Sequence, residues 1–362
     1  MPKHNMTSIR LQNALFLSRM ILHKPVFLMR LAAAYFRVLV LKQTPLRFMD
    51  IAFDYSCNMT CEHCSAVSLK QKDKPQLTAE EYGRIAKTLR REGCLVFHFT
   101  GGEPLLRDDL PDVIRAFKPS RCTVSVQTNG QLATHEKLVA LKKAGVDIFC
   151  VSIDSGIPEE HDAFRRTKGA FDKAMAALDL AASLGFRTSI STCLSHNNLK
   201  SEGLMRVIEI AEKKGIWVNF NLAVPAGNWQ ENTSFLLTPE DRIYMENLMA
   251  EHPCCRTDFS SNYFRWGCSA IKEKLYLTAY GDVMPCPFIQ ISFGNVREEH
   301  VSKIRKRGLG VKVFKGYPQI CLAAEDREFI AKCECYSNYA GQLPMPYNKV
   351  DWIVGELNGG AK

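Results

Sequence analysis

Alternation between short β-rich runs and helical stretches is the feature that most constrains how this 362-residue chain can fold. Four of the five predicted helices are each followed by a glycine and then by a new β-rich run, at Gly93, Gly145, Gly185 and Gly215. Glycine suits the left-handed residue that closes a helix, so these joins predict repeated strand–helix units. Such units give parallel strands with right-handed crossovers. We therefore expect an α/β fold, a partial (β/α)6 barrel similar to a TIM barrel.

The predicted elements alternate between residues 48 and 224. The strands are Phe48–Tyr55, Cys94–Thr100, Cys122–Gln127, Ile148–Asp154, Arg187–Cys193 and Trp217–Val224. The helices are Thr78–Arg91, Leu110–Phe117, His135–Ala144, Phe171–Leu184 and Leu204–Lys214. In such a barrel the loops after the strands gather at one rim and carry the active site, so functional residues are sought there.

Three cysteines lie on one short loop directly after the first predicted strand. Cys57, Cys61 and Cys64 have the spacing C-x3-C-x2-C. Their thiolates can hold three corners of a cubane [4Fe–4S] cluster, whereas electron-carrier clusters normally take four cysteines. The fourth iron is then open, and an open coordination position is where a substrate or cosubstrate binds. The loop therefore predicts chemistry at the cluster and not electron storage.

Further motifs follow the next three strands: Phe99-Thr-Gly-Gly-Glu-Pro-Leu105, Gln127-Thr-Asn-Gly130 and Val151-Ser-Ile-Asp-Ser155. Each is weak alone, because Gly-Gly and Asn-Gly pairs are common in turns. Together, after successive strands, they are specific. With the loop Cys57-Asn-Met-Thr-Cys-Glu-His-Cys64, the chain resembles radical S-adenosylmethionine (SAM) enzymes over about residues 48–340. It is most similar to the branch that has a C-terminal SPASM or Twitch auxiliary-cluster domain.

This resemblance implies roles for particular residues. The three cysteines would hold the catalytic cluster, and the methionyl group of SAM would chelate its open iron. Gly101 and Gly102 would allow close backbone approach, and Glu103 matches an acid that accepts a hydrogen bond from the SAM amine. Arg165 would be a bidentate carboxylate partner or, alternatively, an exposed helix-end cation. The other implied SAM contacts are Asn129, Ser152 and Asp154.

The chain also departs from the family pattern in two places. His63 stands before the last cysteine, where many members have an aromatic residue. The fifth strand reads Ser189-Ile-Ser-Thr-Cys-Leu-Ser-His196 and lacks the glycine-rich motif that contacts adenine in the family. The adenine contacts are therefore not assigned from the sequence.

A second group of cysteines begins in the C-terminal part. Cys268 and Cys286 flank a predicted hairpin, with Lys274–Ala279 as its first strand and Tyr280-Gly-Asp282 as its turn. This spacing, and the later Ser292-Phe-Gly-Asn-Val296, resemble the opening of a SPASM or Twitch domain. A hairpin brings its two flanking cysteines close together.

The resemblance implies one auxiliary [4Fe–4S] cluster. Its ligands would be Cys268, Cys286 and Cys321, with Cys333 or Cys335 as the fourth, and the sequence does not decide between the last two. The alternative is a set of buried, unligated thiols. Four cysteines lie within predicted strands and are expected to be small core residues: Cys94, Cys122, Cys150 and Cys193. The adjacent Cys254 and Cys255 are poorly placed to share a cluster and would be substrate-facing or inert.

Charge is concentrated at the N-terminus. Residues 1–49 hold eight of the 47 basic residues and no acid, which leaves 39 basic against 38 acidic residues elsewhere. A nucleic-acid partner is therefore not expected, because such enzymes carry a basic stripe on the catalytic body. Within residues 25–42, Leu28, Ala32, Tyr35 and Leu39 share one helical side, and Arg30 and Arg37 lie on the other. This helix either rests on anionic lipid or packs on the domain with its arginines in solvent.

Four parts are expected: a basic amphipathic helical extension (1–46), the radical SAM barrel (47–235), the auxiliary-cluster domain (236–345) and a tail (346–362). No secretory signal is recognisable, and clustered cysteines indicate metal ligands in a reducing compartment, so we expect a cytoplasmic protein, peripheral on the membrane if the helix binds lipid.

The function expected is reductive SAM cleavage to a 5′-deoxyadenosyl radical that abstracts hydrogen from a peptide, lipid or small metabolite. Flavodoxin or ferredoxin would donate electrons, and the auxiliary cluster would transfer an electron or bind substrate. The alternative is an iron–sulfur redox or cluster-carrier protein without SAM turnover.

Overall fold

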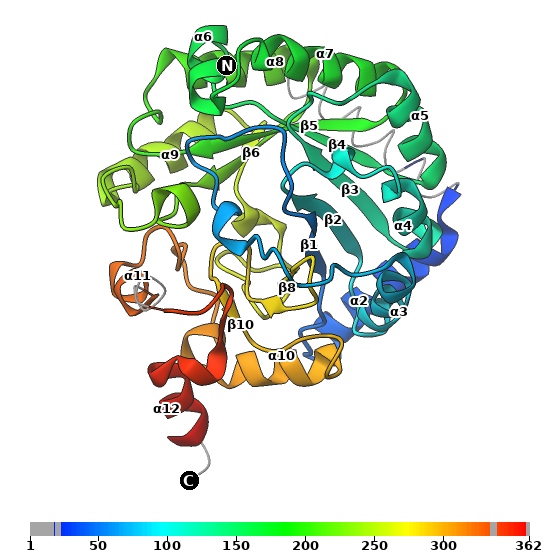
Figure 1. Cartoon of the computed structure of the whole chain (residues 1–362), viewed down its shortest axis with the longest axis vertical. Helices are drawn as coiled ribbons and strands as arrows, with labels where there is room; N and C mark the ends of the chain where they lie inside the picture. The colour runs from blue at the N-terminus through cyan, green and yellow to red at the C-terminus, as the bar shows by residue number, and fades with distance from the viewer. Residues whose placement is uncertain (1–17, 19–22, 334–338, 360–362) are drawn as a thin grey trace.

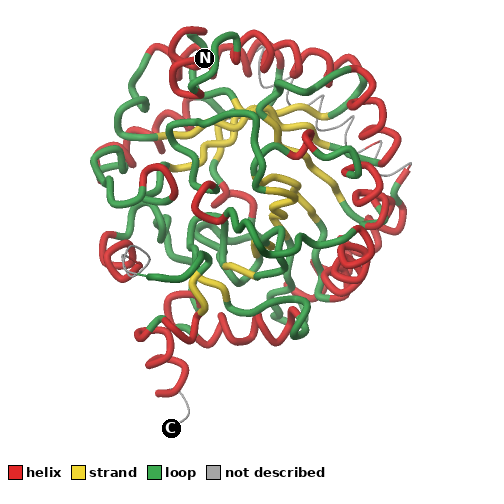
Figure 2. The backbone as a smooth tube through the Cα atoms, in the orientation of Figure 1, coloured by secondary structure: helices red, strands yellow, loops and turns green. Residues whose placement is uncertain are grey.

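The computed structural model describes Ser18, residues 23–333 and residues 339–359, and one large sheet lies at its centre (Figures 1 and 2). Nine strands form this sheet in the order β7-β6-β5-β4-β3-β2-β1-β8-β9. Their bounds are β1 Phe48–Asp54, β2 Val96–Gly101, β3 Thr123–Thr128, β4 Ile148–Ser152, β5 Arg187–Leu194, β6 Trp217–Leu222, β7 Cys255–Arg256, β8 Lys274–Leu277 and β9 Val283–Met284.

In this order, every pair of neighbouring strands from β7 through to β8 is parallel, and β9 runs antiparallel to β8. Asp50 of β1 lies opposite His98 of β2 on one side and Tyr276 of β8 on the other. The predicted open parallel barrel of six strands is confirmed, and three short strands extend its sheet. β7 extends the sheet beyond β6, and β8 and β9 extend it beyond β1. β8 and β9 are the strands of the hairpin predicted after Cys268, whereas the two-residue β7 was not predicted.

Helices cover the outer face of this sheet (Figure 1). Thr78 caps α3 by accepting a hydrogen bond from the Glu81 amide, while the Glu81 carboxylate accepts one from the Thr78 amide. Gly145 and Gly215 close α5 and α8 in the left-handed conformation. The barrel helices are α3 Ala79–Arg91, α4 Leu110–Ala116, α5 His135–Ala144, α6 Pro158–Arg165, α7 Ala170–Ser183, α8 Glu202–Lys214 and α9 Pro239–Glu251. The five predicted helices agree within two residues, whereas α6 and α9 were not predicted.

The core lies between the strands and this helical layer. Phe53 and Phe99 pack edge to face, and Phe99 also contacts Phe117, the residue that follows α4. Polar side chains occupy the opposite side of the strands, where His98 of β2 contacts Gln127 of β3 at 3.1 Å. Because side chains alternate across a strand, one face of the sheet is sealed by apolar packing and the other gives the barrel a polar lumen.

Helix α2 (Pro25–Leu39) packs on the outside of this body. Phe27 and Ala34 are buried against Leu95 and Tyr263. Arg30 does not point into solvent, because its guanidinium donates to the carbonyls of residues 90, 94 and 121. Packing on the domain therefore occurs, but with Arg30 facing inward. Within the described residues, no helix is both long enough and apolar enough to cross a bilayer.

The C-terminal part continues from the hairpin. β8 pairs with β1, so the hairpin predicted there is an extension of the barrel sheet. A two-stranded sheet pairs β10 (Ile291–Ser292) with β11 (Met345–Pro346). The remaining helices are α10 Val301–Gly310, α11 Arg327–Cys333 and α12 Asp351–Gly359. The domain limits given above stay a prediction.

Candidate functional site

The cysteine loop leaves β1 at the predicted rim. Cys57 is exposed, Cys61 is buried and Cys64 is half-buried. The loop begins with a tight turn in which the Asp54 carboxylate accepts from the amides of Tyr55 and Ser56, at 2.6 and 3.0 Å. This turn fixes the direction in which the chain enters the three cysteines.

The glycine pair after β2 holds the cysteine loop from one side. The Gly102 amide donates to the Asp54 carbonyl at 2.7 Å, and the Glu103 amide donates to the Ser56 carbonyl at 2.8 Å. A Cβ at Gly101 or at Gly102 would stand 2.1 Å from one of these carbonyl oxygens. Gly101 and Gly102 were expected to allow a close backbone approach, and in the structure the backbone that they approach is that of the cysteine loop.

The turn after β6 holds the same loop from the other side. The Asn228 side chain donates to the Cys61 carbonyl at 2.8 Å, and its amide donates to the Cys64 carbonyl at 3.0 Å. Gly227 has φ 63° and lies so close that a Cβ there would be 2.1 Å from the Cys64 oxygen. Sequence reasoning missed both residues, and the dipeptide Gly-Asn in the loop that follows the sixth strand was the available signal.

Glu103 lies beneath the loop and is fully buried. Its carboxylate accepts three hydrogen bonds, from the Leu105 amide, the Thr128 hydroxyl and the Asn129 amide, at 2.7 to 3.0 Å. Burial nevertheless raises the pKa of Glu103 above its usual value. A carboxylate offers about four acceptor positions, so one remains for a further donor.

Asn129 joins the end of β3 to the first cysteine. Its Nδ2 donates to Asn58 Oδ1 at 2.8 Å and lies 3.9 Å from Cys57 Sγ. Ser152, at the end of β4, is buried and contacts Gln127 Nε2 at 3.5 Å. Two of the predicted SAM contacts therefore lie on neighbouring strands of the same rim, and Asn129 touches the cluster loop.

Asp154 and Arg165 form a buried ion pair after β4. Arg165 Nε and Nη2 both lie 2.6 Å from Asp154 Oδ2, and Arg165 Nη1 lies 3.8 Å from Cys61 Sγ. The Cys193 amide donates to the other carboxylate oxygen at 2.9 Å. Burial acts to raise the pKa of Asp154, but Arg165 together with His63, His161 and the Cys193 amide holds it below the usual value. Arg165 is therefore not the exposed helix-end cation of the alternative prediction.

His63 takes the place of the family's aromatic residue by stacking. Its ring lies parallel to Phe164 with centroids 4.4 Å apart, and it also contacts Trp229. Burial, followed by the charge of Arg165, lowers the pKa of His63 to about 4. The ring is therefore neutral at physiological pH and packs as an aromatic group.

The three thiols suit a cluster better than a single ion. Burial raises the pKa of the half-buried Cys64 above its usual value, and the neighbouring Cys61 adds to the effect. Coordination to a metal deprotonates a thiol outright, so bound iron would remove this cost. Across the described residues, no three cysteine, histidine or acidic groups converge tightly enough for one metal ion. A cubane does not require that convergence, because each thiolate binds a different iron.

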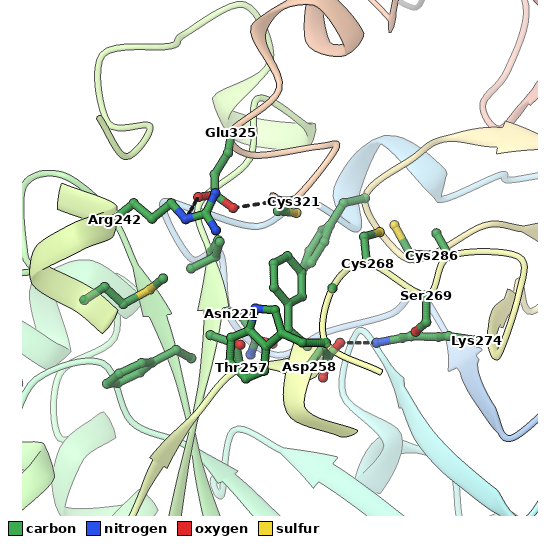
Figure 3. Close-up of a pocket in the computed structure, with 18 of the residues that line it drawn as sticks. Asn221, Arg242, Thr257, Asp258, Cys268, Ser269, Lys274, Cys286, Cys321 and Glu325 are labelled. Carbon is green, nitrogen blue, oxygen red and sulfur yellow. Dashed lines mark hydrogen bonds and ion pairs between the residues drawn. The ribbon is translucent and has the colours of Figure 1, made fainter. Parts of the chain in front are cut away.

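A second set of cysteines borders an apolar cavity between β6, α9 and the C-terminal part (Figure 3). Cys268, Cys286 and Cys321 all line it, with the sulfurs of Cys268 and Cys286 near one another in Figure 3. Burial raises the pKa of Cys286 to about 12, with Cys268 adding to the effect. The Cys321 amide donates to Glu325 Oε2 at 2.6 Å. The structure thus brings together three of the predicted auxiliary ligands.

The predicted fourth ligand is not settled. Cys333 ends α11 and packs half-buried against the core, and Cys335 lies outside the described residues. Of the four cysteines expected to fill the core, Cys94, Cys122 and Cys150 are buried and Cys193 is half-buried. Cys254 and Cys255 are both buried.

Comparison with known protein families agrees with this geometry. Residues 53–212 match the Radical SAM superfamily, and residues 268–336 match SPASM, an iron–sulfur cluster-binding domain. An AdoMet-dependent heme synthase of Oleidesulfovibrio alaskensis is 25% identical over 291 residues, which are 72% of this chain and 74% of that protein. One of Nitratidesulfovibrio vulgaris is 27% identical over 328 residues, 82% and 83% of the two chains.

Solved structures show the same fold at low sequence identity. SuiB of Streptococcus suis bound to precursor peptide SuiA matches with a TM-score of 0.60 and 15% identity, covering 77% of this chain and 67% of SuiB. The enzyme anSMEcpe with bound AdoMet matches with a TM-score of 0.58 and 18% identity, covering 77% and 84%. The protein described here is an enzyme that belongs to the radical SAM superfamily and carries a SPASM iron–sulfur cluster-binding domain.

Proposed function

We propose that this enzyme cleaves SAM reductively at a [4Fe–4S] cluster held by Cys57, Cys61 and Cys64, and that it removes a hydrogen atom from its substrate. The observation that carries this proposal is the meeting of three loops at one rim. The cysteine loop lies against the buried Glu103 on one side and the Asp154–Arg165 pair on the other. A cluster bound there would supply the electron that splits SAM into methionine and a 5′-deoxyadenosyl radical.

The chain's own residues would bind and orient the reactants. The fourth acceptor position of Glu103 is suited to the SAM amine, since the other three are already used by protein donors. Gly101 and Gly102 would keep the backbone of the rim close to the cluster loop. N–H groups of Asn129 and Arg165 would donate to the sulfurs of Cys57 and Cys61, and such hydrogen bonds tune a cluster's potential.

Ser152 and Asp154 would contact the ribose or the carboxylate of SAM. Asp154 already accepts from Arg165, so this ion pair would act as one unit that presents Arg165 to the SAM carboxylate. Residues that exclude water, among them His63 and Phe164, would protect the reactive radical from stray hydrogen donors.

The auxiliary [4Fe–4S] cluster would bind to Cys268, Cys286 and Cys321, with Cys333 or Cys335 as its fourth ligand. It would accept an electron from the substrate or anchor the substrate in the adjoining cavity. Flavodoxin or ferredoxin would supply electrons to the catalytic cluster. No disulfide joins the cysteines in the part of the chain that the structure describes, and this suits a cytoplasmic enzyme.

The decisive measurement is 5′-deoxyadenosine formation by anaerobically reconstituted, dithionite-reduced protein. Wild type should form it from SAM, and the Cys57/Cys61/Cys64→Ala triple variant should not. Cys122→Ala is the matched control, because this buried thiol lies away from the site and should leave turnover unchanged. Equal turnover by the triple variant would end the proposal, and a wild type that holds iron without cleaving SAM would indicate the carrier alternative.

A further inference from the structure

Helix α2 turns an apolar stripe toward solvent. Met29, Phe36 and Val40 are 72%, 55% and 60% exposed, and they recur at helical spacing on one side, with Val26 and Leu39 beside them. Two cations of this segment, Lys24 and Arg30, form their interactions on the inner side of the helix. Lys24 pairs with Asp147 at 2.6 Å, and Arg30 donates to backbone carbonyls of the body. A helix that only completed the core would present the opposite arrangement.

The surroundings of this stripe are basic. Exposed cations flank it at the α3 C-terminus, in the turn before β3 and after α2 itself: Arg91, Lys118, Arg121 and Lys42. The backbone around these cations is adjacent to the helix, because Arg30 donates to carbonyls at residues 90 and 121. Residues 1–49 contribute no acid. An apolar stripe edged by cations complements an anionic lipid surface, where a helix lies in the interface.

Aromatic side chains continue the stripe toward the auxiliary site. Tyr35 of α2 contacts the ring of Phe264 at 5.3 Å, and Phe264 is 67% exposed. Two residues further on, Trp266 is 42% exposed and also lines the cavity that contains Cys268, Cys286 and Cys321. Trp266 therefore stands at the mouth of the cavity, on the loop that α2 contacts.

The cavity itself suits an apolar group. Its walls include Phe220, Met245, Met249 and Phe288. Its charged groups are already compensated, since Arg242 lies 3.8 Å from Glu325 and Lys274 pairs with Asp258. A substrate that placed an ionic group deep in this cavity would find no unpaired partner among these residues.

We propose that α2, Phe264 and Trp266 form a docking surface for an anionic phospholipid bilayer, which brings the cavity mouth to the membrane. The substrate would accordingly be a membrane-borne amphiphile whose apolar part enters beside Trp266. This second statement rests on the proposed function, whereas the docking surface does not.

Docking is tested with the full-length reconstituted enzyme by co-sedimentation with vesicles. Wild type should bind phosphatidylcholine–phosphatidylglycerol vesicles and bind pure phosphatidylcholine more weakly. Met29→Asp/Phe36→Asp should lower the partition coefficient about tenfold or more, because charge is forced into the interface. Ile243→Asp is the matched control, since Ile243 is 61% exposed on α9, away from α2. Equal binding of vesicles by wild type, the double variant and the control would overturn the proposal. It would also be overturned if wild type dimerised and did not bind vesicles, because the stripe would then be an interface between two copies of the chain.

Trp266 provides a second measurement. Brominated phospholipids should quench part of the tryptophan fluorescence, and Trp266→Phe should abolish that part. The proposed function is tested in a separate assay, which measures 5′-deoxyadenosine formation without substrate and without vesicles. A failure of the proposed function is thereby distinguished from a failure of docking. For substrate class the probe is cis-parinaric acid, whose fluorescence should rise on entering the cavity and fall in Met249→Asp. If the fluorescence of cis-parinaric acid does not rise with wild type, the assignment of an amphiphilic substrate is overturned. The docking surface is then judged by the vesicle experiment alone.

Discussion

Gly227→Ala should disturb the catalytic cluster through one backbone contact. The added Cβ would stand 2.1 Å from the Cys64 oxygen and 2.7 Å from Ser65 Cα, whereas real Cβ contacts stay above 3.0 Å. Because these atoms are backbone, no side chain can rotate away, and the loop must move by about 1 Å. A displacement of that size can cost about a hundredfold in rate. The clash should also lower the free energy of unfolding by about 1–3 kcal/mol.

Gly169→Ala separates this clash from backbone strain. Gly169 has φ 74°, close to the 63° of Gly227, but a Cβ there would meet nothing within 4 Å. Both variants therefore carry the strain of a left-handed alanine, about 1–2 kcal/mol, and only Gly227→Ala adds the clash.

The assay compares iron and sulfide content after anaerobic reconstitution, the electron paramagnetic resonance signal of the reduced cluster, and the rate of 5′-deoxyadenosine formation. Gly169→Ala should resemble wild type in all three, with a modest loss of thermal stability. If Gly227→Ala behaves like Gly169→Ala in cluster content and rate, then the turn after β6 does not position the cysteine loop and the reasoning is wrong.

Three further substitutions test electrostatics at a buried, an exposed and a partly buried ion pair. Arg165→Gln should lower the free energy of unfolding by about 3–5 kcal/mol in urea titrations, because Asp154 is left buried and uncompensated. Arg84→Gln should lower it by under about 0.5 kcal/mol, since the pair of Arg84 with Glu80 is exposed. Similar losses of stability in the two variants would contradict the role of burial. Glu81→Gln should cost about 1 kcal/mol at pH 7. Hydrogen bonds from Arg297 lower the pKa of Glu81 to about 2, so its contribution is present above the unfolded pKa and is lost as the pH falls through the folded value. The difference from wild type should therefore narrow below about pH 4.5, and a constant difference would rule out this origin.

The barrel could be predicted because its signals are local. A helix, a glycine and a β-rich run recur within a few residues, and Gly145 and Gly215 do close their helices in the left-handed conformation. β7 has two residues and carries no periodicity, so only its pairing with β6 defines it. The place of β8 beside β1 joins residues more than 200 positions apart and has no local signature.

Helix α2 shows the limit of amphipathicity arguments. Its residues were correctly read as one helix, but the arginine side was expected to face water. Arg30 instead satisfies carbonyls at the end of α3 and before β3, which are positions no helical wheel can include. Which face of a helix is buried depends on the hydrogen-bond groups that the neighbouring elements leave unpaired.

The candidate site was predicted as a set of ligand contacts, but the structure gives several of these residues a second task. Gly102 and the Glu103 amide hold the backbone of the cysteine loop, and the Glu103 carboxylate fixes the turn after β3. A motif can therefore be recognised from its sequence although part of its structural role is not apparent. The reason is that its partners are backbone atoms, which any residue can supply. It follows that replacing Glu103 would disturb ligand binding and loop position together. A Cβ at Gly227 would meet backbone atoms of the loop first, so Gly227 separates the two effects and is the better probe of how the rim positions its cysteines.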